Sequence, residues 1–437
     1  MRQMIPRREF FGKAASVAIA PLMLGRGAGT PNASNDYLSA GIPSDVFKMI
    51  QIGEKYQAPT FSKEEYKRRW QTLQRSMEAK KVDCLMILDP HDLRYVANLF
   101  GGRDEDDYPC LITLKSEPSL FIPWPEVYYY IVEISPIPEI VNADNSSMME
   151  AAKKIKQLGL EKGTIGIDSL DGIRYKSYAL LQRELPEAKF VEASDIVLEC
   201  WQIKSEAEIE LFRKSQEIGE KAFRAMTQTA KAGVTDREVM GAALGALISA
   251  GADMDTRIMH NISHWPEPSP YSARNFALSH PYYMGGTERK LQKGDIIGFE
   301  LYSSYGGYTS DVCLPISIGE PHPDYVMRFE ICKEMVRIGQ GLLRPGHTQA
   351  DIDSKLTEYL SSQLKTKTTA ITDYKNFCPI PNRGDRTLKS IRPGMVIAIT
   401  PVTIWNGGPN HLCAETFVTT QEEPQRIGNL PLEIAVV

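Results

Sequence analysis

Between residues 61 and 192 the chain alternates between helical periods and short apolar runs. The spacing predicts a charged helix over 63–80, directly before the apolar run 82–89. Further strand-like runs lie at 110–114, 119–124, 164–168 and 189–191, and helical periods cover 147–157 and 175–185. Such alternation predicts an α/β layer in which helices cover a sheet. Because no GxGxxG motif follows any of these runs, the layer carries no dinucleotide-binding fingerprint.

After Trp201 the pattern changes, and helices and strands are grouped separately. Ser205 with Glu208 forms a capping box that opens one helix, and Thr235 with Glu238 opens a second. Helices over 323–343 and after 348 follow, and strand-like runs lie at 294–319, 395–405 and 411–420. This grouping predicts an α+β domain with antiparallel strands.

The segment 294–319 reads as two strands that carry two acidic side chains, Glu300 and Asp311, on an apolar background. Carboxylates in such strands are costly to bury unless they are paired, hydrogen-bonded or bound to a metal. The pattern therefore predicts a site built around these two acids. Tyr302 is two residues after Glu300, so it shares the same face and is predicted to line the site.

The first residues combine a basic start with an apolar run, 14–24, that is too short to span a bilayer. Arg7 and Arg8, followed by Phe10 and Phe11, resemble a twin-arginine export signal. A disordered basic terminus is the alternative. We predict a periplasmic or otherwise exported protein that is free of the membrane after signal removal. The predicted parts are a signal peptide at 1–33, an N-terminal domain at 34–200 and a C-terminal domain at 201–437.

Composition narrows the class of protein further. Lys and Arg total 50 against 55 Asp and Glu, and no basic block occurs, so nucleic acid is not an expected partner. The roughly 400 residues after the signal are too many for one core, which predicts two domains. The seven cysteines include no CxxC pair, so they predict neither a disulfide framework nor a zinc site.

Four motifs together resemble the creatinase, aminopeptidase P and prolidase family. They are IKSEAEIELFRKSQEIGEKAF, QKGDIIGFELYSSYGGYTSD, RPGHTQADI and RPGMVIAITP. The resemblance covers nearly the whole chain after the signal. It implies an α/β N-terminal domain followed by an α+β "pita-bread" C-terminal domain, and it implies a homodimer.

Peptidases of this family bind two divalent metals through two Asp, one His and two Glu. The resemblance places the first Asp position on Glu300 and the second on Asp311. The His position falls at 371–374, which holds no histidine, the first Glu position holds Thr400, and the last is Glu415. Three carboxylates are too few for a dinuclear centre. A single hard cation such as Mg²⁺, Mn²⁺ or Ca²⁺ remains open.

The resemblance assigns roles to histidines as well. Creatinase works without metal through a histidine acid/base, and His280 matches that position, with a structural loop histidine as the alternative. His411 is four residues before Glu415, hence on the same face, and is a further candidate ligand for a single cation. His260 and His264 are predicted to lie in a loop, because two prolines follow them closely.

Creatinase also uses an aromatic side chain and an arginine from the partner subunit's N-terminal domain. Phe100 and Arg103 occupy a comparable segment, YVANLFGGR, and arginine suits a substrate carboxylate. Pairing of Arg103 with the acidic run 104–107 is the alternative. Arg383 and Arg386 are further candidates for carboxylate binding.

These interpretations predict a creatinase-like hydrolase of a C–N bond in a small cationic or zwitterionic substrate, with no cofactor. His280 would move the proton, while Glu300, Asp311 and Glu415 bind the cationic group or orient water. An anionic site favours guanidinium, amidine, ammonium or sulfonium groups. The alternatives are an Xaa-Pro metallopeptidase with an unusual metal site and a non-catalytic ligand-binding relative. A lyase also remains open, because one is known in this fold.

Overall fold

The computed structural model describes residues 61–99, 107–143, 146–253, 256–264, 288–364, 370–376, 390–403 and 413–437. The chain divides into two units, Met1–Gln57 and Ala58–Val437, and the first lies outside the described residues. None of the helices in the described ranges is both long and apolar enough to cross a membrane.

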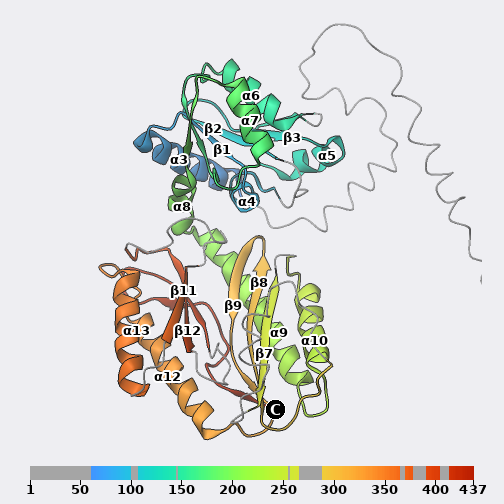
Figure 1. Cartoon of the computed structure of the whole chain (residues 1–437), viewed down its shortest axis with the longest axis vertical. Coiled ribbons are helices and arrows are strands. Elements are labelled where there is room, and N and C mark those ends of the chain that lie inside the picture. The colour runs from blue at the N-terminus through green and yellow to red at the C-terminus, as the bar shows by residue number, and fades with distance from the viewer. Residues whose placement is uncertain are drawn as a thin grey trace, which may run out of the picture. The chain divides into compact units, whose positions relative to one another are not determined.

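The N-terminal part of the second unit is a mixed six-stranded sheet with helices around it (Figure 1). Its strand order is β4-β3-β2-β1-β5-β6; β2 is antiparallel to β1 and β3, and the other pairs are parallel. The strands are β1 (Cys84–Ile87), β2 (Cys110–Thr113), β3 (Ser119–Ile122), β4 (Glu139–Asn142), β5 (Thr164–Ile167) and β6 (Lys189–Glu192). The helices are α3 (Lys63–Lys80), α4 (Pro90–Ala97), α5 (Pro125–Ile134), α6 (Ser147–Gln157), α7 (Tyr175–Glu184) and α8 (Ser194–Gln202).

Strand β1 shows why this layer buries both faces of its sheet. Its side chains alternate, so that Cys84 and Met86 pack in one hydrophobic cluster while Leu85 and Ile87 pack in another. Four consecutive buried residues are typical of a strand covered on both sides. The α/β prediction for this part of the chain is confirmed.

Within the described residues, the C-terminal part contains four helices and two sheets, which are antiparallel except for the parallel pair β10–β15. One sheet has the order β15-β10-β8-β7, with β9 paired to β8, and the other has the order β11-β12-β13-β14. The helices of the C-terminal part are α9 (Glu206–Thr229), α10 (Asp236–Ser249), α12 (Pro323–Gln340) and α13 (Gln349–Leu364). The first sheet is built from β7 (Arg257–His264), β8 (Asp295–Tyr305), β9 (Tyr308–Val312), β10 (Ile316–Ser317) and β15 (Ala435–Val436). The second is built from β11 (Ala370–Asn376), β12 (Val396–Thr403), β13 (Glu415–Val418) and β14 (Gln425–Arg426).

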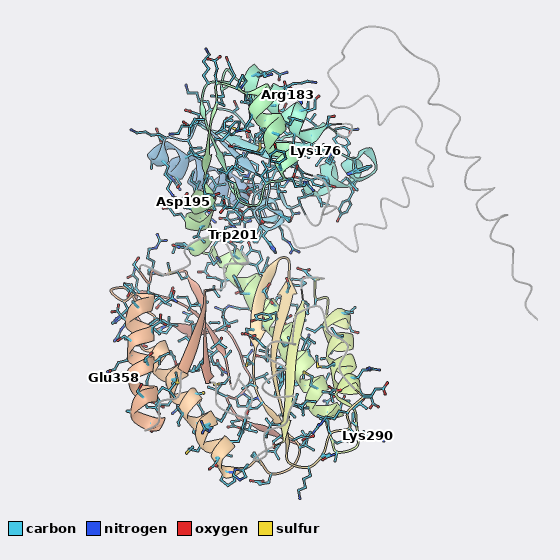
Figure 2. All side chains as sticks on the ribbon, viewed as in Figure 1. Lys176, Arg183, Asp195, Trp201, Lys290 and Glu358 are labelled. Atoms are coloured by element: carbon cyan, nitrogen blue, oxygen red, sulfur yellow. The ribbon has the colours of Figure 1, made fainter. Side chains whose placement is uncertain are left out.

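The helices lie on the outer sides of these two sheets, with the strands between them (Figure 1). This is the α+β arrangement that the grouping of helices and strands predicts. Exposed charged side chains such as Arg183, Lys290 and Glu358 point outward, whereas Trp201 is buried (Figure 2). The predicted domain boundary at 200–201 falls in the last turn of α8. The predicted loop around His260 and His264 is wrong, because these residues lie in strand β7.

Helix α9 defines the outer face of the β8–β9 hairpin. A side-chain carbon at Gly219 of α9 would lie 2.9 Å from Val312 Cγ2 and 3.3 Å from Leu301 Cδ2. Leu301 and Val312 are a directly opposed pair, so both face the helix. Side chains alternate along a strand, and the neighbouring positions therefore face away from α9. For each of the two sheets, we call the face that is turned away from these helices its inner face.

Helix α12 defines the outer face of the second sheet in the same way. A side-chain carbon at Gly339 of α12 would lie 2.6 Å from Ile399 Cδ1, so Ile399 of β12 faces the helix. Its neighbours Ala398 and Thr400 consequently belong to the inner face. The two sheets meet where Ala414 N donates to Cys313 O at 3.0 Å.

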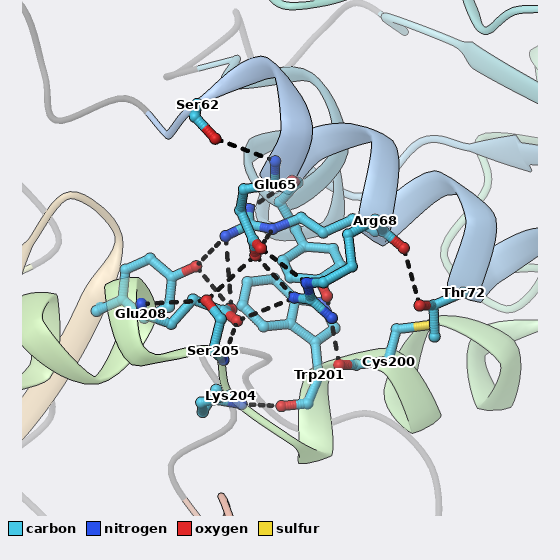
Figure 3. Close-up of polar contacts among 12 residues, drawn as sticks. Ser62, Glu65, Arg68, Thr72, Cys200, Trp201, Lys204, Ser205 and Glu208 are labelled. Carbon is cyan, nitrogen blue, oxygen red and sulfur yellow. Dashed lines mark hydrogen bonds and ion pairs between the residues drawn. The ribbon is translucent and has the colours of Figure 1, made fainter.

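A buried ionic network joins the N-terminal domain to the hairpin. Arg69 of α3 is fully buried and donates to Tyr95 O at 2.8 Å, to Glu65 Oε1 at 2.9 Å and to the Tyr308 hydroxyl at 3.2 Å. The Tyr308 hydroxyl in turn donates to Glu208 Oε1 at 3.0 Å. Figure 3 shows the polar contacts around Glu65 and Glu208. Because Tyr308 begins β9, the network ties α3 to the strand that carries Asp311.

A second contact holds the turn of the hairpin. Asp253 Oδ2 accepts from Gly307 N at 2.7 Å, from Ser304 Oγ at 3.3 Å and from Arg94 Nη2 at 2.9 Å. Gly306 and Gly307 have φ values of 60° and 85°, which suit glycine in a tight turn. Arg94 belongs to α4, so the N-terminal domain contacts the hairpin at its turn as well as at Tyr308.

Candidate active site

Glu300 and Asp311 lie on the inner face of the β8–β9 hairpin. The register opposes Tyr302 directly to Asp311, and Glu300 is two residues along the same strand. The three side chains therefore share one face, as predicted, and the two acids are diagonal neighbours within reach of a common ligand. Both acids are only 1% exposed. Two carboxylates placed together in a buried setting form a strongly anionic site.

Two threonine hydroxyls belong to the same face of the second sheet. Thr416 is opposed to Ala398, and Thr400 is two residues further along β12, so the threonines are diagonal neighbours. Their exposed fractions are 0% for Thr400 and 2% for Thr416. Within the described part of the chain, neither Oγ1 has a hydrogen-bond partner. Both are polar atoms on the inner face of the second sheet.

Several contacts bring the two inner faces together. Strand β13 contacts β9, and the hydrogen bond from Ala414 to Cys313 joins their ends. Asp311 is two residues before Cys313, and Thr416 is two residues after Ala414. Tyr302, half-buried, packs against the hydrophobic cluster that also includes Val396, Ala398 and Val418. The acids of the hairpin and the threonines of the second sheet therefore belong to one site.

Glu415 is not brought together with Glu300 and Asp311. It is opposed to Ile399, which faces α12, so Glu415 projects from the outer face. There it forms a two-pronged ion pair with Arg426, which also donates to Leu430 O. Burial raises the pKa of Glu415, and the hydrogen bond from Arg426 opposes that rise. These contacts give Glu415 a structural role.

The remaining candidates from the sequence lie outside the described residues. The structure describes neither His280, the candidate acid/base, nor His411, the candidate ligand. The same holds for the predicted substrate-binding residues Phe100, Arg103, Arg383 and Arg386. Their roles stay predictions.

Comparison with known proteins places this arrangement in a family. Residues 210–421 match the model described as metallopeptidase family M24, and residues 69–201 match the creatinase/prolidase N-terminal domain. The chain belongs to the creatinase, prolidase and aminopeptidase P family. The two matches occur in the order that the sequence motifs imply, with the N-terminal domain first.

Relatives within the family are hydrolases of several kinds. Creatinase from a Bacillus species is 24% identical over 321 residues, which cover 71% of this chain and 74% of that enzyme. Ectoine hydrolase from Halomonas elongata is 22% identical over 405 residues, which cover 86% and 98%. The solved structure of an Xaa-Pro dipeptidase from Bacillus anthracis has a TM-score of 0.72 at 20% identity and covers 85% of this chain and 100% of that one. The family supports a hydrolase and confirms the two-domain fold.

The donors that the described residues place on the inner faces are too few for a dinuclear metal centre of the M24 type. The polar groups on the hairpin and on β12 and β13 include two carboxylates, Glu300 and Asp311, and two neutral hydroxyls, Thr400 and Thr416. Across the described ranges, no group of three His, Cys, Asp or Glu side chains is placed to hold a metal ion. Two dications need more anionic and imidazole ligands than this set supplies.

Proposed function

We propose that this M24-family hydrolase cleaves a C–N bond in a small cationic or zwitterionic substrate, without a dinuclear metal centre. The observation that carries the proposal is the pair of buried acids, Glu300 and Asp311, on the inner face, with the neutral Thr400 nearby. The names of two relatives, creatinase and ectoine hydrolase, support a small nitrogen-containing substrate. Substrate and metal content are the parts that experiment must test.

The chemistry assigns different tasks to the acids. One carboxylate binds the positively charged nitrogen group, because a buried anionic site attracts cations strongly. The other accepts a hydrogen bond from the attacking water and orients it toward the carbon. The water oxygen bonds to that carbon, the C–N bond breaks, and the leaving nitrogen takes a proton. Sequence reasoning assigns this proton transfer to His280.

A substrate panel tests the proposal. Purified protein is assayed with amidines, ureas, guanidino acids, betaines and Xaa-Pro dipeptides, with and without chelator, and its metal content is measured. We expect hydrolysis of one or more of the first three classes, unchanged by chelator. Two bound metals per chain with chelator-sensitive cleavage of Xaa-Pro dipeptides would overturn the proposal. Full turnover by a His280→Ala variant would show that His280 is not the acid/base.

An Xaa-Pro peptidase with an unusual metal site is the second candidate. The match to metallopeptidase family M24 and the retained acids at Glu300 and Asp311 favour it. Peptide hydrolysis of that kind uses a metal to polarise the amide and activate water. Thr400→Glu is the matched variant, because it restores the acid of the peptidases. Peptidase activity that depends on added metal and increases in this variant would favour the second candidate. A product that lacks the elements of water would indicate a lyase.

Export and assembly are separate proposals. We propose that the twin-arginine signal exports the chain and that the mature protein forms a homodimer. Arg7→Lys with Arg8→Lys should retain the protein in the cytoplasm, as fractionation would detect. Light scattering of the mature protein measures the oligomeric state, and a monomeric mass would contradict the dimer.

A further inference from the structure

Thr400 and Thr416 present a pair of hydroxyls that the fold itself does not use. Both side chains are almost fully buried, and neither Oγ1 has a hydrogen-bond partner in the described part of the chain. A buried hydroxyl without a partner destabilises the folded state, whereas valine has the same shape without that cost. Two such positions on one face indicate a ligand that completes their hydrogen bonds.

The position of the pair identifies the kind of ligand. Both threonines lie on the inner face of the second sheet, the acids Glu300 and Asp311 lie on the inner face of the hairpin, and β13 of the second sheet contacts β9 of the hairpin. A threonine oxygen offers two acceptor sites and one donor, and a carboxylate accepts only. The site is therefore rich in acceptors. A ligand with a positive charge and several N–H groups matches it.

We propose that Thr400 and Thr416 determine specificity by accepting N–H hydrogen bonds from a planar cation that Glu300 and Asp311 hold. This inference rests on the proposed function for the nature of the site. A guanidinium or amidinium group presents several N–H donors in one plane. Some of these donors can pair with the two carboxylates, and others can pair with the threonine hydroxyls. A quaternary ammonium or sulfonium group has no N–H and leaves both hydroxyls unsatisfied. Such cations are recognised by aromatic faces.

Selectivity of this kind follows from the cost of unpaired groups. A site built to hydrogen-bond its ligand rejects an analogue that lacks the matching group, because the buried polar atoms then stay unpaired. The threonines therefore determine which of the cations attracted by the anionic site bind to it. Amidinium and guanidinium compounds bind, and betaine-type compounds do not.

Binding measurements on the full chain test the inference without relying on turnover. The ligands are methylguanidine, which carries N–H donors, and tetramethylammonium, which has none. Thr400→Val and Thr416→Val remove the hydroxyls and keep the shape, while Thr400→Ser and Thr416→Ser keep the hydroxyls as matched controls. We expect each valine variant to weaken methylguanidine binding about tenfold and the serine variants to stay within about threefold. Tetramethylammonium should bind poorly to the wild type and the serine variants, and no more weakly to the valine variants.

Thermal unfolding without ligand gives a second readout that a purely structural role would not produce. If the hydroxyls serve a ligand, each valine variant unfolds at a temperature equal to or above that of the wild type. Valine variants that bind methylguanidine like the wild type would overturn the inference. So would a wild type that binds both cations equally, or a valine variant that unfolds earlier. Threonine-dependent binding without hydrolysis of any panel compound would instead overturn the proposed function alone.

Discussion

At the scale of single residues, three buried carboxylates of the C-terminal domain differ in what their charge does. Glu300 and Asp311 face inward beside half-buried Tyr302, whereas Glu415 faces outward and pairs with Arg426. The first two can be predicted to form a site from sequence, because each is an acid in one of two adjacent apolar strands. Glu415 shows the limit, because a register difference of one residue exchanges the two faces of a strand. The register between β12, which carries Thr400, and β13, which carries Glu415, cannot be counted from sequence, because a long connection joins the two strands.

Glu300→Gln and Glu415→Gln therefore form a matched pair of substitutions with opposite consequences. We expect Glu300→Gln to lower turnover of an accepted substrate by about 100-fold or more and to leave stability nearly unchanged. Glu415→Gln weakens the ion pair with Arg426 and should lower the free energy of unfolding by about 1–3 kcal/mol. At temperatures where the variant is folded, its turnover should remain. Denaturant unfolding and steady-state rates measure both quantities, and a Glu415→Gln protein that is stable but inactive would return this residue to the site.

At the scale of elements, the β8–β9 hairpin is held from two directions. Helix α9 covers its outer face, where Ser215 Oγ lies 3.0 Å from Ser310 Oγ. At its turn, Arg94 and Asp253 contact Gly307. The Tyr302–Asp311 pair is three residue pairs from the turn, roughly 10 Å along the strand. The sequence predicts the two strands of the hairpin. It does not predict the contact between Arg94 and Gly307, because these two residues are far apart in the chain.

Two glycines separate the effect of this contact from that of backbone strain. Gly307 and Gly233 have similar φ values, 85° and 92°. A side-chain carbon at Gly307 would lie 2.4 Å from Arg94 Cδ, whereas at Gly233 no atom lies within 4 Å. Either alanine should cost about 1–2 kcal/mol for the left-handed backbone. Gly307→Ala should cost more, because it displaces Arg94 from Asp253, and it should also lower the turnover rate by a few fold.

The Arg94→Ala background supplies the control for the glycine comparison. In that background the additional stability loss of Gly307→Ala should disappear, and the two glycine variants should become equivalent. Denaturant unfolding of the single and double variants measures this coupling. Equal losses in the wild-type background would show that Arg94 does not constrain the turn.

At the scale of the whole molecule, the described part of the chain has two domains that share a hydrophobic cluster. Tyr66 and Trp70 of α3 belong to the same cluster as Phe212 of α9, Tyr308 of β9 and Val396 of β12. The sequence predicts the two domains and their fold classes, because periodicity and motifs are local properties. It does not predict how they are joined, because Arg69 and its partner Tyr308 are separated by 239 residues. The export signal and the dimer stay predictions.

Arg69 should couple the stabilities of the two domains. It is fully buried against Glu65, Glu208 and Tyr308, whereas its neighbour Arg68 also pairs with Glu65 but has a side chain 43% exposed. Arg69→Met leaves buried carboxylate charge uncompensated, which should lower the free energy of unfolding by about 3–5 kcal/mol. Arg68→Met should cost about 1 kcal/mol or less, because exposed ion pairs contribute little.

The form of the unfolding curve distinguishes a junction from an ordinary buried ion pair. If Arg69 joins the domains, unfolding of the Arg69→Met protein should separate into two transitions, while the wild type and Arg68→Met unfold in one. Trp70 and Trp201, both buried in the cluster shared by the domains, provide a fluorescence signal for the first transition. Circular dichroism follows the loss of helices in both domains. A single, shifted transition in the Arg69→Met protein would mean that the shared hydrophobic cluster alone couples the domains, and that the ionic network only adds stability.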